Sequence, residues 1–271
     1  VKNVPHVAMT DETYASAQSI GAAQQAIRRF VYARSAAFVA ASRGGFRLYE
    51  SYGAPLSRCF RSCLCIDNAS FAPGFGAEDK RYDFIFSGHM EEVANPMFVP
   101  SVATETARLL GRKVRLLLAG AGELENRVHK SVARRSEFVD ADFVTCSSPE
   151  ELPALYRSAR IFLFPTLSDP WGVAVNEACA AGLPVIVTPE AGAAGELVRD
   201  GENGFVCDLN VANWANSAAL LLEQEDTRRN FSARSLWLVE EYNYDNAVNG
   251  LLDACRYALD SRAHGHVGKP I

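Results

Sequence analysis

The sequence predicts an α/β fold in which a doubly wound, Rossmann-like parallel sheet follows a shorter, partial α/β section. Short strand-like runs alternate with longer helical periods along most of the chain, which is the pattern of repeated βαβ units. The runs VRLLLAG (114–120) and RIFLFPT (160–166) are apolar almost throughout, as strands must be when helices cover both faces of a parallel sheet. With 271 residues, 48% of them hydrophobic, the chain is long enough for one large or two small domains.

The first section is predicted to span residues 1–75, including a linker. Its elements, in order, are a strand in VPHVAMT (4–10), a helix near 14–34, a strand in AFVAAS (37–42), a helix near 43–52 and a strand in CFRSCLCID (59–67). The next stretch, DNASFAPGFGAEDK (67–80), is rich in turn-forming residues and has no apolar period. The boundary between the domains is therefore expected there.

The second section, residues 76–242, repeats the alternation more strongly and predicts the doubly wound domain. Strands are expected at 82–88, 114–120, 142–146, 160–166, 184–189 and 204–209. Helices are expected at 96–111, 123–135, 149–158, 173–181, 193–199, 211–223 and 226–241. The last part, 243–271, is expected to form a terminal helix near 244–260 and a flexible tail. The double arginines at 28–29, 134–135 and 228–229 are interpreted as solvated helix faces.

Composition narrows the classes of function. A net charge of −5 and a pI near 5.6 argue against nucleic acid as the main partner and favour a small molecule. No apolar run approaches the roughly 20 residues that span a bilayer, and VKNVPHVAMTDE lacks the order of a signal peptide, so the cytoplasm is the expected compartment. The cysteines at 59, 63 and 65 lack a second ligand pair, so no metal site is expected.

Ligands of doubly wound sheets bind outside the carboxyl ends of the strands, so the loops after the strands hold the candidate residues. After RIFLFPT, Asp169-Pro170-Trp171-Gly172 precedes a helix whose first amides, from Val173, have no intrahelical acceptor and therefore attract anions. Glu177 lies on the second turn among Ala and Val, where an unpaired carboxylate is costly to bury. Two adjacent ribose hydroxyls would be suitable donors to it.

Spacing alone leaves another interpretation open. Asp169 can be an N-cap with Pro170 at the first helical position, and Glu177 can be a solvated residue. A Gly pair such as Gly120 and Gly122 after VRLLLAG can likewise serve only a tight turn.

The passage LSDPWGVAVNEACAAGLPVIVTPEAGAAGELVRDGENGFV (167–206) resembles the signature of glycosyltransferase family 4. In that signature two acidic residues, separated by seven others, precede a small-residue helix end and a Gly-rich turn. The resemblance extends from about Tyr82 to Leu259 and, more weakly, back to Val1. It implies a GT-B fold, of which this chain would contain chiefly the C-terminal, nucleotide-sugar-binding lobe and the last strands and helices of the N-terminal lobe.

The resemblance assigns roles to matching positions. Asp169 stands where the family usually has a Glu whose carboxylate contacts hydroxyls of the transferred sugar, so its reach is shorter by one methylene, and Glu177 stands where the family has the Glu that holds the ribose. Amides around Gly172 and Val173 would face the diphosphate. The resemblance further implies nucleotide contacts at Gly88, His89, Gly120 and Gly122, and a base contact in the loop that ends at Cys146.

Two further positions depart from the family pattern. Phe86-Ser87-Gly88-His89 and Ala94-Asn95-Pro96 resemble an element in which an Arg and a Lys neutralise the leaving diphosphate. Here His89 and Ala94 occupy the positions of the Arg and the Lys. Arg43 and Arg47 could replace the lost charge if the first section folds over the crevice.

The resemblance therefore implies metal-independent transfer of a hexosyl unit, with retention, from a UDP- or GDP-sugar. The donor is a substrate and no cofactor is expected. The acceptor would be a glycan or a lipid-linked molecule bound mainly by the N-terminal lobe, at the cytoplasm or the inner face of the membrane with peripheral membrane contact. The alternatives are a donor-binding module without turnover, which the missing Arg and Lys favour, and a sugar-nucleotide epimerase of the same architecture.

Overall fold

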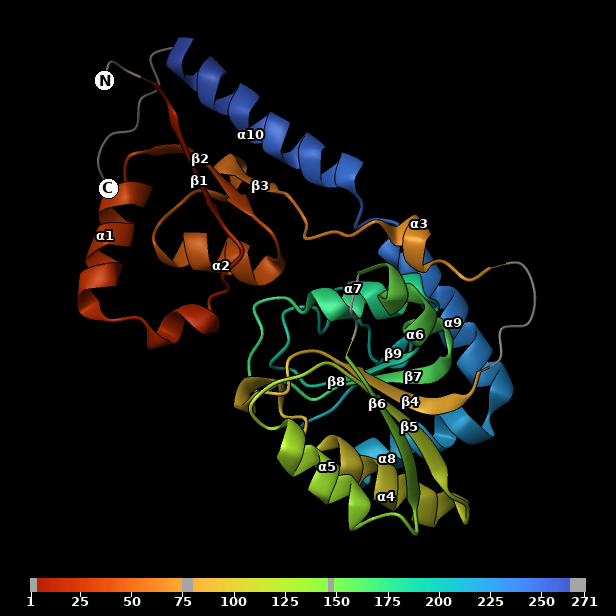
Figure 1. Ribbon diagram of the computed structural model, residues 1–271. Helices are drawn as coiled ribbons and strands as arrows, with labels where there is room; N and C mark the ends of the chain where they lie inside the picture. Colours follow the sequence, from red (N-terminus) through yellow and green to blue (C-terminus); the bar gives the residue numbers. More distant parts are fainter. Residues whose placement is uncertain (1–3, 75–79, 146–148, 264–271) are drawn as a thin grey trace. The chain divides into compact units, whose positions relative to one another are not determined.

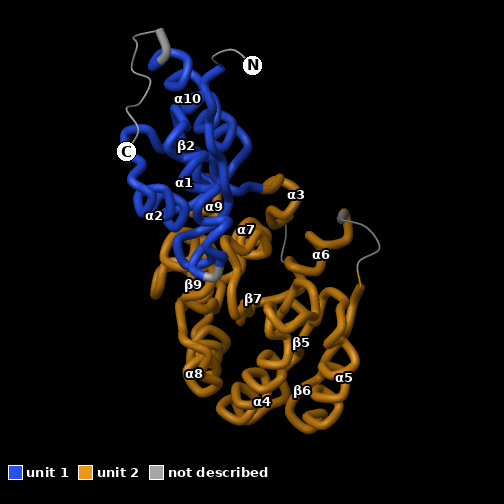
Figure 2. The backbone as a smooth tube through the Cα atoms, turned by 90° about the vertical axis from the view of Figure 1, so that its left-hand side faces the viewer, with its two compact units in different colours: residues 1–65, 241–271 blue, residues 66–240 orange. Residues whose placement is uncertain are grey.

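The computed structural model describes residues 4–74, 80–145 and 149–263. The chain forms two compact units, one from residues 1–65 and 241–271 and the other from residues 66–240 (Figure 2). None of the helices in the described ranges is both long enough and apolar enough to cross a membrane.

The first unit is a small parallel sheet between two layers of helices (Figure 1). Its strands, in the spatial order β1-β2-β3, are β1 (His6–Thr10), β2 (Ser35–Ala40) and β3 (Cys59–Arg61). Its helical segments are η1 (Ser16–Ser19), α1 (Ala22–Tyr32), α2 (Arg43–Ser51), η2 (Leu56–Arg58) and α10 (Tyr244–Ala263). The helix predicted near 14–34 is therefore two shorter segments.

Helix α10 belongs to the first unit. Ala254 and Ala258 on this helix are buried against Ala37 and Val39 of β2, and a side chain at Gly250 would collide with the carbonyl oxygen of Arg61. The terminal helix is thus a covering layer of the first sheet. The prediction, in contrast, treated 243–271 as a separate part.

The second unit is a parallel sheet of order β6-β5-β4-β7-β8-β9. Renumbered from β4, this is the order 3-2-1-4-5-6 of dinucleotide-binding domains, as the doubly wound prediction requires. The strands are β4 (Tyr82–Ser87), β5 (Val114–Ala119), β6 (Val139–Val144), β7 (Ala159–Phe164), β8 (Val185–Val187) and β9 (Gly204–Val206).

Helices cover both faces of this sheet (Figure 1). One face carries α4 (Val99–Leu110), α5 (Glu125–Ala133) and α8 (Val211–Glu223). The other carries α3 (Asn68–Phe71), α6 (Leu152–Arg157) and α7 (Val173–Ala180), and α9 (Glu225–Val239) contacts both α7 and α8. Short 3-10 turns are η3 (Glu92–Ala94) and η4 (Pro149–Glu151). Phe84, Leu116 and Ile161 of the central strands are completely buried, as the apolar runs predict.

Two predictions for this unit need correction. The unit begins at residue 66, ten residues before the predicted boundary at 76, because α3 packs on α6 and α7 with the Phe71 ring 5.8 Å from the ring of Tyr156. Residues 193–199 form turns in place of the predicted helix. Ala194 makes an isolated bridge to Val198, and the Arg199 amide donates to the side chain of Asn203. These local bonds replace the helical ones.

Candidate functional site

The candidate site lies at the carboxyl ends of the central strands, where β4 and β7 are neighbours but the chain proceeds from them toward opposite edges of the sheet. The carbonyl oxygen of Val93, after β4, accepts bonds from the Thr166 hydroxyl (3.0 Å) and the Leu167 amide (2.8 Å), after β7. The Gly192 amide, after β8, donates to the Asp169 carbonyl oxygen at 2.9 Å. Hydrogen bonds thus join three loops at the point where such sheets bind ligands.

The loop after β5 is held against the loop after β4 by backbone bonds. The Gly88 amide donates to the Ala119 carbonyl oxygen at 3.0 Å, and the Met90 amide donates to the Ala121 carbonyl oxygen at 2.9 Å. A Cβ atom on Gly120 would lie 2.0 Å from the carbonyl oxygen of Gly88, so only glycine permits this approach. The structure therefore brings Gly88, Gly120 and Gly122 together, with the side chain of His89 exposed beside them.

Helix α7 begins directly after Gly172. This residue has a φ of 93°, and a Cβ atom there would lie 2.7 Å from the Phe164 ring. Val173 is 43% exposed, and the amides of Val173 and Ala174 belong to the first turn, where no intrahelical acceptor exists. The loop thus presents backbone donors and the positive end of the helix dipole to an anion.

Asp169 has a local structural role. Its Oδ1 accepts a bond from the Trp171 amide at 2.9 Å, which fixes the turn before the helix. The N-cap of α7 is Gly172, so the alternative with Asp169 as N-cap and Pro170 as first helical residue is wrong in position. The Asp169 side chain is half-buried at the same rim.

Glu177 is not the solvated residue of the alternative interpretation. It is half-buried, and its Oε2 accepts a hydrogen bond from the Tyr156 hydroxyl at 2.7 Å. Burial raises the pKa of the carboxyl group above its ordinary value, and donation from Tyr156 lowers that pKa in part. A carboxylate in this setting still has acceptor capacity on its second oxygen.

Tyr156 is the residue that sequence reasoning missed. It is completely buried on α6, in contact with Phe71 and Phe162. An aromatic residue in an apolar helical period normally indicates core packing, and nothing in its local sequence points to a carboxylate on another helix. The contact depends on the tertiary packing of α6 against α7.

A buried hydrogen bond supports the same loop from behind. The Trp171 indole nitrogen donates to Asn176 Oδ1 at 2.7 Å, and both side chains are buried. The bond ties the loop to the second turn of α7, so Gly172 and Glu177 are held in a fixed relation to each other.

The remaining predicted positions are not among these loop residues. Cys146 lies outside the described residues. Arg43 and Arg47 are exposed on α2 of the first unit. In the described part of the chain, no three side chains of His, Cys, Asp or Glu are grouped as a metal site.

The loops of the candidate site are poor in positive charge. The segments 88–96, 120–124, 165–172 and 188–196 contain no Lys or Arg. Asn95, in the first of these, has a φ of 52° and is the one non-glycine residue with positive φ among those described. Donors to an anion in these segments are therefore backbone amides, His89 and neutral side chains such as Ser168 rather than fixed cations.

Comparison with known proteins gives consistent results. The family model described as glycosyl transferases group 1 matches residues 68–235. D-inositol 3-phosphate glycosyltransferase of Nocardia farcinica is 28% identical over 181 residues, which are 64% of this chain and 40% of that protein. The enzyme of the same name from Rhodococcus erythropolis is 26% identical over 233 residues, covering 80% of this chain and 52% of its own. The chain thus spans about half the length of the curated relatives it matches.

Solved structures share the fold. HepE of Anabaena, in complex with UDP, matches 93% of this chain and 72% of its own with a TM-score of 0.78 and 13% identity. The C-terminal domain of a glycosyl transferase group 1 family protein, LpcC of Francisella tularensis, matches 65% of this chain and 96% of its own with a TM-score of 0.58 and 18% identity.

Proposed function

The chain belongs to the glycosyl transferases group 1 family, and on this premise we propose that its second unit binds the nucleotide-sugar donor of a hexosyl transfer. The observation that carries the proposal is the start of α7, where open amides after Gly172 and the half-buried carboxylate of Glu177 are held together at the switch point of the sheet. The amides would bind an anion and the carboxylate would accept bonds from a pair of hydroxyl groups. These two protein groups are five residues apart on one loop and helix. A nucleoside diphosphate carries both an anion and a pair of hydroxyl groups.

We assign each part of the donor to a group of atoms. The diphosphate would bind the amides at Gly172 and Val173, with Gly88 and Gly120 leaving room for the backbone to approach it. The ribose hydroxyls would donate to Glu177, and the sugar would contact Asp169 at the rim. UDP is the first nucleotide to test, because HepE was solved with UDP, and GDP is the second.

The proposed reaction retains configuration at the anomeric carbon. The bond from that carbon to the β-phosphate oxygen breaks, a new bond to the acceptor hydroxyl oxygen forms on the same face, and the acceptor proton passes to the departing phosphate. The protein contributes positioning and stabilises the charge that develops on the phosphate. The acceptor is a glycan, a lipid-linked molecule or, as the names of the relatives suggest, a phosphorylated cyclitol.

A second function is favoured by one observation. His89 and Ala94 stand where cations would neutralise the leaving group, and no Lys or Arg occurs in the loop segments of the candidate site. A donor-binding module without turnover would have this composition.

Incubation of the chain with UDP-glucose and GDP-mannose, with and without D-inositol 3-phosphate as acceptor, separates the two functions. Transfer to an α-configured product, measured by proton NMR, would establish a retaining transferase. Saturable nucleotide-sugar binding without hydrolysis of the donor to water, a reaction that needs no acceptor lobe, would support the binding module. Absence of binding to any nucleotide would contradict both.

A further inference from the structure

A groove between α4 and α5, on the outer side of the second unit, gathers positive charge that the donor site does not use. Two adjoining cavities of about 290 and 360 Å³ form the groove and share Arg134 and Arg135. The other cations that line it are Arg108, Arg127 and Lys130. Among the residues that line the two cavities, Glu105 is the one acidic side chain, and it pairs with Arg108 at 3.1 Å.

The two arginines of 134–135 differ in their surroundings. Arg135 is half-buried, and its guanidinium donates to the Ser131 hydroxyl at 2.8 Å and to the Ser101 hydroxyl at 3.3 Å. Because these hydroxyl partners are neutral, they do not compensate the positive charge of Arg135. In the described part of the chain, no carboxylate lies within 4.0 Å of Arg127, Lys130, Arg134 or Arg135. The interpretation of 134–135 as only a solvated helix face is therefore incomplete, since Arg135 is fixed across two helices.

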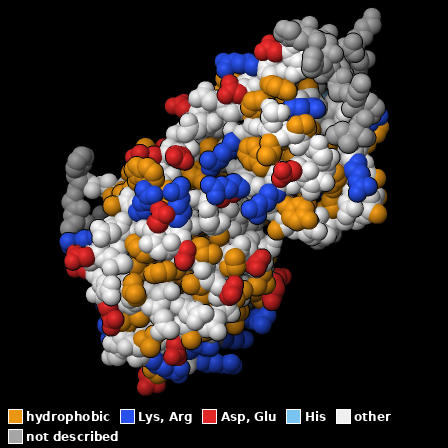
Figure 3. All heavy atoms as spheres, turned by 180° about the vertical axis from the view of Figure 1, so that it is seen from behind, with side chains coloured by type: hydrophobic (Ala, Val, Ile, Leu, Met, Phe, Trp, Pro, Cys, Tyr) orange, Lys and Arg blue, Asp and Glu red, His pale blue; other side chains and the backbone are white. Residues whose placement is uncertain are grey.

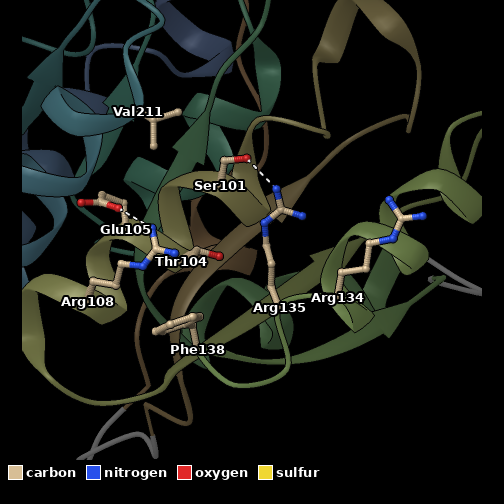
Figure 4. A pocket seen from close by; sticks show the side chains of 8 residues that line it. All are labelled: Ser101, Thr104, Glu105, Arg108, Arg134, Arg135, Phe138 and Val211. Carbon is tan, nitrogen blue, oxygen red and sulfur yellow. Dashed lines mark hydrogen bonds and ion pairs between the residues drawn. The ribbon is translucent and has the colours of Figure 1, made fainter.

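Figure 4 shows how the cations are arranged. The guanidinium groups of Arg108, Arg135 and Arg134 lie one after another along the groove and do not converge on one point. Lys and Arg side chains also gather along the lower edge of the second unit in Figure 3, at the height of α4 and α5 in Figure 1. This spacing suits a row of separate anionic groups better than a single small anion.

An apolar side chain flanks the same row. Leu109 lies one helical turn after Glu105 on α4 and is 48% exposed. An exposed leucine beside cations gains free energy by entering the acyl boundary of a bilayer, whereas it gains little against a nucleic-acid backbone. The chain as a whole carries a net charge of −5, so attraction to an anionic surface must come from a local patch.

We propose that the α4–α5 groove is a docking surface for the phosphate headgroups of an anionic lipid bilayer. Each exposed Lys or Arg near such a surface contributes enough attraction to change partitioning about fivefold, and the attraction decreases within a Debye length as salt rises. The docking surface does not depend on the proposed transfer reaction.

The test compares binding of the full chain to vesicles of phosphatidylcholine alone and to vesicles with about 30% phosphatidylglycerol, measured by cosedimentation at low and high salt. We expect binding only to the anionic vesicles. The variant R127Q/K130Q/R134Q should lose about 100-fold in partitioning, since it removes three charges. These three side chains are exposed, so the variant should keep the unfolding temperature of the parent.

A matched control removes three exposed cations outside the groove. Arg81 and Arg115 lie at the starts of β4 and β5, with side chains on the sheet face opposite α4, and Arg229 is on α9. R81Q/R115Q/R229Q has the same net charge as the groove variant and should bind vesicles like the parent. Leu109→Gln should weaken vesicle binding without changing any interaction with duplex DNA.

Several results would overturn the proposal. These are failure of the parent to bind anionic vesicles, equal losses in the two triple variants, and tighter binding to pyrophosphate or duplex DNA than to the vesicles. A parent that binds vesicles but no nucleotide would leave the docking surface supported and contradict only the donor site.

Discussion

At the scale of single residues, the Tyr156–Glu177 pair should make nucleotide binding at the proposed donor site sensitive to pH. Ribose hydroxyls donate to an ionised carboxylate, and burial has already raised the pKa of Glu177. Nucleotide affinity should therefore fall as the pH decreases through that raised pKa. The stability of the free protein depends on pH in the opposite direction. The stabilisation that results from the raised pKa of Glu177 is present at low pH and is lost as the pH rises through the pKa of the folded state.

Tyr156→Phe separates these effects because it keeps the buried ring and removes the donor. The pKa of Glu177 should rise further, so the midpoint of UDP affinity against pH should move to higher pH. Affinity at neutral pH should fall about three- to tenfold, the value of one ordinary hydrogen bond. Calorimetric titration over a pH series measures both. An unchanged midpoint would show that Tyr156 contributes only to packing and that its hydroxyl does not affect the pKa of Glu177.

Asp169→Asn distinguishes the local role of this residue from a contact with the sugar. Asparagine can still accept the bond from the Trp171 amide, so the turn and the stability should be preserved. Loss of the negative charge should reduce affinity for UDP-glucose while affinity for UDP stays the same. Equal losses for both ligands would show that Asp169 shapes the loop and does not contact the sugar.

Gly172→Ala tests the start of α7 directly. The left-handed backbone and the Phe164 ring 2.7 Å from the new Cβ should together lower the free energy of unfolding by about 1–3 kcal/mol and displace the amides. Thermal unfolding with and without UDP measures both effects. Gly201→Ala is a control for backbone strain alone, since that glycine has a φ of 72° but no atom near its Cβ.

At the scale of elements, the sheet is anchored at its amino ends by an ion pair remote from the crevice. Asp83 on β4 is buried, with Arg112 donating to both of its oxygens at 2.9 and 3.0 Å. Arg112→Ala leaves the carboxylate with the Arg115 amide and Arg160 at 3.8 Å. Because Arg112 is itself half exposed, we expect a loss of about 2 kcal/mol in urea unfolding.

The same change should leave nucleotide affinity of the folded protein intact. Lys113→Ala, at the exposed neighbouring position, should leave both stability and affinity unchanged. We expect folded Arg112→Ala protein to bind UDP like the parent. A large loss of UDP binding at temperatures where this variant is folded would contradict the claim that the Asp83–Arg112 ion pair does not affect the site.

Elements with strong local signals were predictable, and elements set by tertiary bonds were not. The apolar runs at β5 and β7 and the Gly-rich loops after β4 and β5 are evident in the sequence because burial on both faces and close backbone approach each demand a residue type. Residues 193–199 have a helical composition, but the bond from the Arg199 amide to buried Asn203 holds them in turns. The contact of Tyr156 with Glu177 depends on the tertiary packing of α6 against α7, which no local sequence pattern indicates.

At the scale of the whole molecule, residues 66–240 contain the whole family match, the complete six-stranded sheet and every described residue of the candidate site. Residues 66–240 form a compact unit with a hydrophobic core of their own. A fragment of residues 66–240 should therefore unfold cooperatively and bind UDP with an affinity within about twofold of the full chain. Aggregation, or folding without UDP binding, would show that the first unit is needed.

The central claim is that a nucleoside diphosphate binds at the start of α7 with its ribose on Glu177. Calorimetric titration of UDP into the full chain, Glu177→Gln and Glu223→Gln tests it most directly. Glu223 is an exposed residue at the end of α8, so its variant controls for the lost charge. We predict saturable binding by the parent and by Glu223→Gln, and affinity at least about tenfold weaker for Glu177→Gln. Equal affinities of the three proteins would contradict the claim.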